Sequence, residues 1–241
     1  TAIGRGTTAS GYYSTAMGRG TIASGDNSTA MGYNLEASGN YSTAMGISTT
    51  ASGDYSTAMG SFTEASGGAS TAMGWYTTAS GIGSTAMGYV TTASGNYSTA
   101  IGRNTTASDY ASTVIGQHNL LGSTVTNSAT QFSTDNTALV IGNGADSDNR
   151  SDAFVVKFNG DATLAGSMTA TSFIGDGSQL TNLPSSGADS PFSYNSNEAG
   201  GIEVANYTTA SGSRAFAVGN DNSASGSSST AMGRGTIASG D

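Results

Sequence analysis

The chain has 241 residues, of which 36 are Gly and only 2 are Pro, and it contains no Cys. Without Cys there is no disulfide framework and no thiolate metal site, and the Gly residues lack the collagen period. The net charge is −9, which argues against binding to nucleic acid. No apolar run approaches the roughly 18 residues of a membrane span, so we expect no membrane contact by this segment.

An Ala-x-Gly motif returns every seven residues over the first half of the chain. Its middle residue alternates, with Ser10 before Gly11 and Met17 before Gly18, so the true repeat is 14 residues long. A coiled coil is excluded because heptad seams need large apolar residues, and Gly in a helix costs about 1 kcal/mol. The pattern predicts a β-solenoid with two short strands and two turns in each coil.

Strand alternation assigns the faces of each predicted coil. Ala9, Ala16 and their counterparts are expected to fill a narrow interior with room only for Ala, Ser or Gly. One outer face, which includes Thr8 and Glu36, is polar and hydrated. The other carries a stripe that needs a cover, and the simplest cover is another copy of the chain. This stripe contains Met17, Met31, Met45, Met59, Met73 and Met87.

The repeated Ser-Thr-Ala-Met-Gly and Ala-Ser-Gly motifs resemble the head domains of trimeric autotransporter adhesins, typified by the Yersinia adhesin head. The family motif has the form Ser-Val-Ala-Ile-Gly, so Thr15 and its counterparts replace the usual Val. The resemblance covers residues 1–116 and again about 205–241. It implies an all-β fold, a left-handed parallel β-roll in each chain, and a homotrimer with the Met stripe in its core. It also implies an extracellular fibre on a bacterial cell surface.

Residues 14–26 and 229–241 have the same sequence, but their separation is not a whole number of 14-residue repeats. We infer that an insert breaks the phase of the repeat. The predicted parts are a β-roll at 1–116, a β-rich insert at 117–204 and a second β-roll at 205–241. Because both ends of the chain fall inside a motif, we expect any signal peptide, anchor or stalk to lie outside these residues.

Within the insert, the apolar run at 137–141 predicts a strand. An Asn-Gly turn signal between two further runs predicts a β-hairpin over residues 153–165. The stretches 149–154 and 172–184 resemble a connector found in phage tail fibres and related trimeric surface proteins.

Residues that carry chemistry are scarce. His118 is the only His and is interpreted as a surface or axial polar residue, with ion binding near a threefold axis as the alternative. Asp146, Asp148 and Asp152 resemble a calcium loop, but Arg150 occupies a ligand position and the EF-hand pattern fails. There is no Gly-x-Ser-x-Gly elbow. We therefore predict no enzymatic activity, no metal site and no cofactor.

Aromatic residues are expected mainly in turns. Tyr41 and Tyr55 are one repeat apart, as are Trp75 and Tyr89, so each pair should stack on adjacent coils about 4.8 Å apart. Amphipathic aromatic residues are typical of protein interfaces. We predict Trp75, Tyr76 and Tyr89 as a possible ligand contact, with packing between subunits as the alternative role.

The predicted function is a non-enzymatic trimeric surface fibre that adheres to host cells, matrix or other surfaces through a host protein or glycan receptor. The alternative is a structural or receptor-binding segment of a phage tail fibre or spike. A glycan depolymerase would need an acidic pair in a groove, whereas Glu36 and Glu64 are two coils apart. An ice-binding solenoid would need a flat Thr-x-Thr array, and only one Thr of each Thr-Thr-Ala-Ser unit is expected to face outward.

Overall fold

The computed structural model describes residues 1–122, 128–169, 193–194, 202–203 and 208–240. In these residues the chain forms strands and turns and no helix, as the all-β prediction requires. The chain divides into two compact units, Thr1–Thr169 and Ala170–Asp241.

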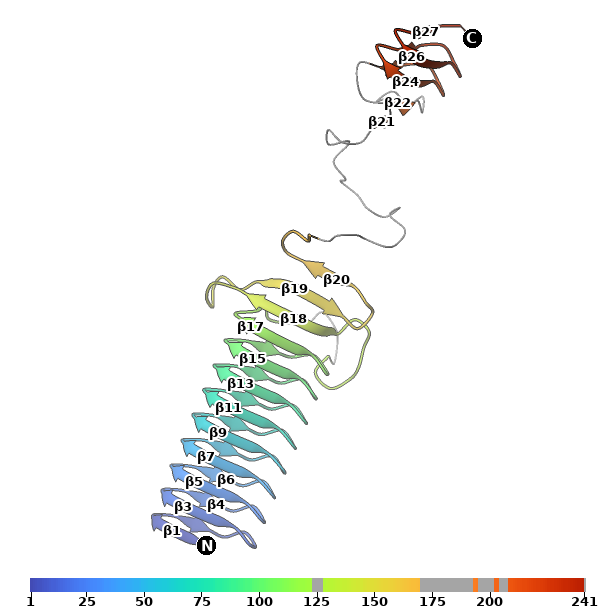
Figure 1. Ribbon diagram of the computed structural model, residues 1–241. Helices are drawn as coiled ribbons and strands as arrows, with labels where there is room; N and C mark the ends of the chain where they lie inside the picture. The colour runs from blue at the N-terminus through green and yellow to red at the C-terminus, as the bar shows by residue number, and fades with distance from the viewer. Residues whose placement is uncertain (123–127, 170–192, 195–201, 204–207, 241) are drawn as a thin grey trace. The chain divides into compact units, whose positions relative to one another are not determined.

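In the first unit each 14-residue coil contains one long and one short strand, and the coils stack in a ladder (Figure 1). The long strands are β1 (Ala2–Arg5), β3 (Thr15–Arg19), β5 (Thr29–Tyr33), β7 (Thr43–Ile47), β9 (Thr57–Ser61), β11 (Thr71–Trp75), β13 (Thr85–Tyr89), β15 (Thr99–Arg103) and β17 (Thr113–Gln117). The short strands are β2 (Thr8–Ala9), β4 (Ile22–Ala23), β6 (Glu36–Ala37), β8 (Thr50–Ala51), β10 (Glu64–Ala65), β12 (Thr78–Ala79), β14 (Thr92–Ala93) and β16 (Thr106–Ala107). Equivalent strands pair in parallel with equivalent residues opposite each other, as Ala16 is with Ala30. The predicted parallel β-solenoid is therefore confirmed.

Ala residues fill the interior of the coils. Ala16 and Ala23 are fully buried, and so are their counterparts along the roll as far as Ala107. The prediction that only Ala, Ser or Gly would fit inside was wrong at one position throughout the roll and, in the last coil, at Val114, which takes an Ala position and is 2% exposed. Thr21 and Leu35 share the first of these positions and are 0% and 2% exposed. This residue lies two positions before the buried Ala of the short strand, so alternation turns its side chain to the same side, into the coil.

Gly recurs because adjacent coils approach too closely for a side chain. A Cβ added to Gly60 would lie 2.0 Å from the carbonyl oxygen of Gly74 in the next coil, and Gly60 has a φ of +126°. A Cβ added to Gly53 would lie 2.1 Å from the carbonyl oxygen of Gly67. Left-handed backbone in the turns is mostly held by other residues, such as Tyr41 with a φ of 58°.

The long-strand sheet continues beyond residue 116. β17 pairs in parallel with β18 (Thr137–Asn143). β18 then pairs antiparallel with β19 (Asp152–Lys157), and β19 with β20 (Ala162–Leu164). The predicted strand and hairpin are both confirmed, and the short-strand sheet ends earlier, at β16.

The second unit contains the same kind of coil. Its short strands are β23 (Thr209–Ala210), β25 (Ser223–Ala224) and β27 (Ile237–Ala238), and its other sheet contains β21 (Ser193–Tyr194), β22 (Ile202–Glu203), β24 (Phe216–Asn220) and β26 (Thr230–Arg234). Ala217 and Ala224 are fully buried inside it. The connector-like stretch 172–184 lies outside the described residues, and the predicted boundaries of the insert stay predictions.

Candidate functional site

Each coil of the first unit presents two faces and two edges. The long-strand face carries the Met column, and the short-strand face carries residues such as Glu36 and Thr50. We call the turn from a short to a long strand the first edge, as at residues 39–41. The turn from a long to a short strand, together with the last residue of the long strand, is the second edge, as at residues 75–77.

An apolar stripe follows the long-strand face from coil to coil. Successive long strands place equivalent Met residues opposite one another, namely Met17, Met31, Met45, Met59, Met73 and Met87. Met17 and Met31 are 36% and 40% exposed, and Ile101 and Ile115 extend the stripe with 39% and 36% exposure. The structure therefore places all six predicted residues in one column that the chain's own side chains leave partly open.

Three aromatic residues meet at the second edge. The ring centroids of Trp75 and Tyr89 are 4.6 Å apart with planes tilted by 36°, and Trp75 meets Tyr76 edge-on at 4.6 Å. At the first edge, Tyr41 and Tyr55 stack at 5.0 Å with nearly parallel planes. The predicted stacking is confirmed for both pairs, and the three predicted contact residues lie together. Their role as a ligand contact stays a prediction.

The sequence reasoning did not include Phe62 or the neighbouring Arg residues in this site. Phe62 stacks on Tyr76 at 4.6 Å with an interplanar angle of 8°, and the spacing of one repeat between them was the available signal. Arg103 lies over the ring of Tyr89 at 5.9 Å from its centroid. The second edge therefore already holds a cation–π contact.

The aromatic cluster spans two sides of the second edge. Strand alternation places Trp75 and Tyr89 on the same side as the Met stripe. Phe62 and Tyr76, one position further along their coils, line a hollow of about 290 Å³ with Glu64 on the short-strand side. The two sides therefore have different chemistry.

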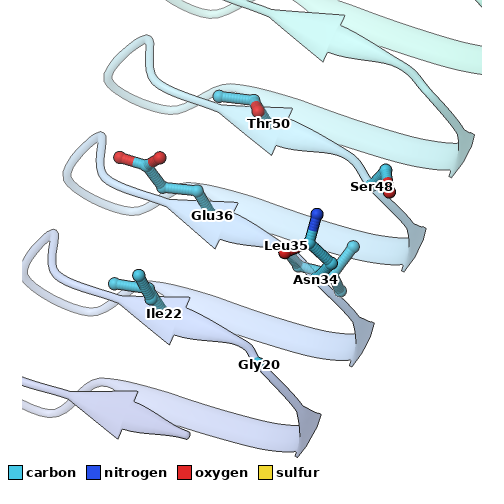
Figure 2. A pocket seen from close by; sticks show the side chains of 7 residues that line it. All are labelled: Gly20, Ile22, Asn34, Leu35, Glu36, Ser48 and Thr50. Atoms are coloured by element: carbon cyan, nitrogen blue, oxygen red, sulfur yellow. The ribbon is translucent and has the colours of Figure 1, made fainter. Parts of the chain in front are cut away.

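A second hollow of about 190 Å³ adjoins the first, because Ser48 and Thr50 line both. Figure 2 shows Ile22, Glu36 and Thr50 one above another on the short strands. In this second hollow the turn residues are polar, and Glu36 has no aromatic wall beside it. The hollow around Glu64 thus differs from that around Glu36 mainly in its two rings.

The placement of His118 corrects the prediction of a surface or axial residue. His118 is only 3% exposed within one chain, so its ring cannot line an axis between three chains. Its Nε2 lies 3.4 Å from Nδ2 of Asn104, and its carbonyl oxygen accepts a hydrogen bond from the Ser151 N–H at 3.1 Å. The loop before β19 therefore packs over it.

The acidic loop is held by its own hydrogen bonds. Asp146 accepts hydrogen bonds at 2.9 Å from the backbone N–H groups of Asp148 and Asn149 and from Asn149 Nδ2. The side-chain hydrogen bond from Asn149, together with the backbone donors, lowers the pKa of Asp146. No cluster of three or more metal-ligating His, Cys, Asp or Glu residues occurs in the described parts of the chain.

Arg150 and Asp152 fasten this loop to the end of the roll. Arg150 Nη1 donates hydrogen bonds to the carbonyl oxygens of Asn104 and Asn119, both at 3.1 Å. Burial raises the pKa of Asp152, whose carboxylate accepts a hydrogen bond from the Leu120 N–H at 3.0 Å. The loop that resembles a calcium site in sequence thus has the geometry of an end cap.

A parallel β-solenoid with 14-residue coils and a partly open apolar stripe defines this chain as a β-solenoid repeat protein. It matches the YadA head domain repeat at residues 1–21, 9–34, 37–63, 65–91, 93–119, 210–236 and 224–241. These matches cover more than half of the chain, so the chain belongs to the YadA head domain repeat family. The search of curated proteins returned no match. Among the described residues, no helix is long and apolar enough to cross a membrane.

Proposed function

We propose that this chain is a segment of a non-enzymatic homotrimeric fibre on a bacterial cell surface, which attaches the cell to host proteins, glycans or other surfaces. Membership of the YadA head family supports the adhesin class. The observation that supports the trimer is the partly exposed apolar stripe of the long-strand face, which two further copies of the chain would cover. Fully burying a Met side chain stabilises by about 1.5–3 kcal/mol, and each stripe residue would gain the part that corresponds to its exposed fraction.

The trimer is tested by light scattering or sedimentation at micromolar concentration. The wild-type chain should be a trimer, and a folded monomer would contradict the proposal. Met59→Lys puts a charge into the proposed core and should dissociate the trimer, because an unpaired buried charge is costly. Glu36→Lys, on the opposite face of the roll, is the matched control and should leave the trimer intact.

Attachment is proposed to use the cluster of Trp75, Tyr76 and Tyr89, repeated three times around the fibre. Weak contacts of this kind gain strength from avidity when several engage one surface. Replacing Trp75 and Tyr89 by Ser should weaken attachment to matrix proteins or glycans while the trimer persists. Unchanged attachment by a trimeric double variant would remove this cluster from the proposal.

We expect no catalytic turnover. The chain has one His and no Cys, and the described carboxyl groups with shifted pKa values both belong to the end cap. Assays against host polysaccharides should therefore show no product. Reproducible cleavage of a glycan by purified wild-type protein would overturn this part of the proposal.

The phage tail-fibre alternative was motivated by connector-like stretches in the insert. One of them, residues 149–154, contributes to the cap loop and to β19, so it has a local role in ending the roll. The sequence of the parent protein beyond this chain separates the alternatives. A membrane anchor would support the adhesin, and a tail or chaperone module would support the phage fibre.

A further inference from the structure

We infer that the hollow lined by Phe62, Tyr76 and Glu64 binds an arginine side chain of a partner protein. The two rings are nearly parallel and are 45% and 46% exposed. Glu64 is exposed in the same hollow, beside the hydroxyl groups of Ser48 and Thr50. A carboxylate next to a stacked aromatic wall matches a planar cation, which can stack on a ring face and hydrogen-bond to the carboxylate.

Arginine already stacks on rings of the second edge at other coils, at the strand-end position that Trp75 and Tyr89 share. The guanidinium of Arg19 lies 5.4 Å from the ring centroid of Tyr33, and that of Arg103 lies 5.9 Å from the centroid of Tyr89. Exposed rings at this edge therefore accept a guanidinium from a neighbouring coil when one is present. Phe62 and Tyr76 are rings of the same edge whose neighbouring coils offer none.

The sequence supplies no cation at this height of the roll. Between Arg19 and Arg103 the chain has no Lys or Arg, whereas the same interval contains Asp26, Glu36, Asp54 and Glu64. In a trimer whose chains run in parallel and in register, the neighbouring copies bring the same interval to this level and supply no cation either. A cation that pairs with Glu64 would therefore come from a different molecule.

The hollow remains accessible in the proposed trimer. The long and short strands form opposite sides of a narrow coil, so a Met stripe at the axis turns the short-strand face outward. In this respect, and in the register of the neighbouring copies, the inference rests on the proposed function. Arginine fits the hollow better than lysine because its planar, weakly hydrated guanidinium stacks on rings and donates to carboxylates in a fork geometry. The partner is accordingly a basic protein surface that presents exposed arginine.

The probe is an acetylated and amidated Gly-Arg-Gly-Gly-Arg-Gly peptide, with a citrulline version as the neutral control. Trp75 is the only Trp in the chain, and its ring lies against Tyr76, so its fluorescence reports on the hollow. The arginine peptide should change this emission saturably at about millimolar concentration, and added salt should weaken the effect. The citrulline peptide should cause no saturable change, and equal binding of both peptides would overturn the inference.

Glu64→Gln removes the charge with little change in shape, and Phe62→Asn removes one ring at a left-handed position that Asn tolerates. Each variant should weaken binding about three- to tenfold. Glu36→Gln removes the equivalent charge from the hollow without rings and should change binding less than about twofold. Unchanged binding by Glu64→Gln, or an equal loss in Glu36→Gln, would refute the assignment.

Thermal unfolding of each variant shows that the roll is intact, and light scattering of the same samples separates this inference from the proposed function. A trimer that fails to bind the peptide refutes the arginine site alone. A monomer that binds it in a Glu64-dependent way supports the site and refutes the trimer, because all residues of the hollow lie in one chain.

Discussion

The repeated coils of residues 1–117 and the cap that follows them provide hydrogen-bond partners for equivalent backbone N–H and C=O groups in different ways. Along the strands of the roll, backbone pairs with backbone, as where the Thr92 N–H donates to the carbonyl oxygen of Thr105 at 2.8 Å. Side-chain acceptors join some coils at the first edge, where Asp26 Oδ1 accepts from the Tyr12 N–H at 2.8 Å. At the last coil, the side chain of Asn119 replaces the missing strand. Its Oδ1 accepts from the Thr106 N–H at 2.8 Å, and its Nδ2 donates to the Thr106 carbonyl oxygen at 3.0 Å.

Asp109 makes the same substitution at the first edge. It stands at a position of the repeat that is otherwise Gly, and its Oδ2 accepts hydrogen bonds from the N–H and the hydroxyl of Thr137 at 2.9 and 2.7 Å. A side chain fits there because no further coil packs above it. Within the roll, the close approach of adjacent coils therefore determines which residues are allowed. At the end of the roll, the side chains are those that can hydrogen-bond to backbone groups which would otherwise lack a partner.

The largest effect is expected from a side chain placed between coils. Gly60→Ala would push a Cβ against the carbonyl oxygen of Gly74 and impose a φ of +126° on Ala. Clash and strain together should cost about 3 kcal/mol or more. Gly68→Ala is the matched control, because the nearest atom to its added Cβ is 4.0 Å away. Denaturant unfolding compares the two, and equal stabilities would show that coil spacing does not select Gly.

A second large effect is expected inside the coil. Ala44 is fully buried, and Ala44→Leu should overfill the interior at a cost of roughly 1–3 kcal/mol or more in each chain. Glu36→Gln in the same region changes an exposed side chain and should leave the melting temperature nearly unchanged. If both variants melted together, the assignment of Ala44 to the interior would be wrong.

The repeated part of the fold could be predicted from the sequence because every coil contains the same 14-residue pattern. The period of 14 fixed the pairing of strands, and the alternation of Ala16 with Met17 separated inside from outside. Leu35 lies two residues before the buried Ala37, so alternation by itself places it inside the roll. It was missed because the interior was expected to have room only for Ala, Ser or Gly.

The cap was less predictable because its contacts join residues far apart in sequence. The strand at 137–141 and the hairpin have local signals, but nothing local indicates that Arg150 donates to the carbonyl oxygen of Asn104. The candidate site shows the same division. The stacking of Trp75 and Tyr89 followed from the period, whereas the hollow shared by Tyr76 and Glu64 depends on how the edge turns toward the short-strand face.

A moderate effect is expected where the roll ends. Asp109→Gly restores the repeat but removes the acceptor for Thr137, so it should cost about 1–2 kcal/mol by leaving the Thr137 N–H without its partner. Asp109→Asn keeps an acceptor oxygen and should lose less. Hydrogen exchange at Thr137 should quicken more in the Gly variant than in the Asn variant. A Gly variant as stable as wild type would mean that the cap does not depend on this side chain.

The smallest effect is expected from two carboxyl groups of the cap whose pKa values move in opposite directions. Asp146 has a lowered pKa, so the stability that its hydrogen bonds contribute is present above the ordinary aspartate value of about 3.9 and is lost as the pH falls through its folded pKa. Asp152 has a raised pKa, so its protonated form favours the folded state at low pH, and this contribution is lost as the pH rises from about 3.9 through its folded pKa.

NMR titration of the side-chain carboxyl carbons measures both values directly. Asn149→Ala removes the side-chain donor to Asp146 and should bring the pKa of Asp146 back toward its ordinary value, while the pKa of Asp152 stays raised. Asp152→Asn keeps an oxygen for the Leu120 N–H without a charge to bury, so it should stabilise the cap slightly at neutral pH. Because the strands of adjacent coils are joined by backbone hydrogen bonds that do not titrate, hydrogen exchange should show these pH effects in residues 128–164 and not in the strands in the middle of the roll. Equal pH dependence in both regions would remove the distinction between a roll held by its backbone and a cap held by its side chains.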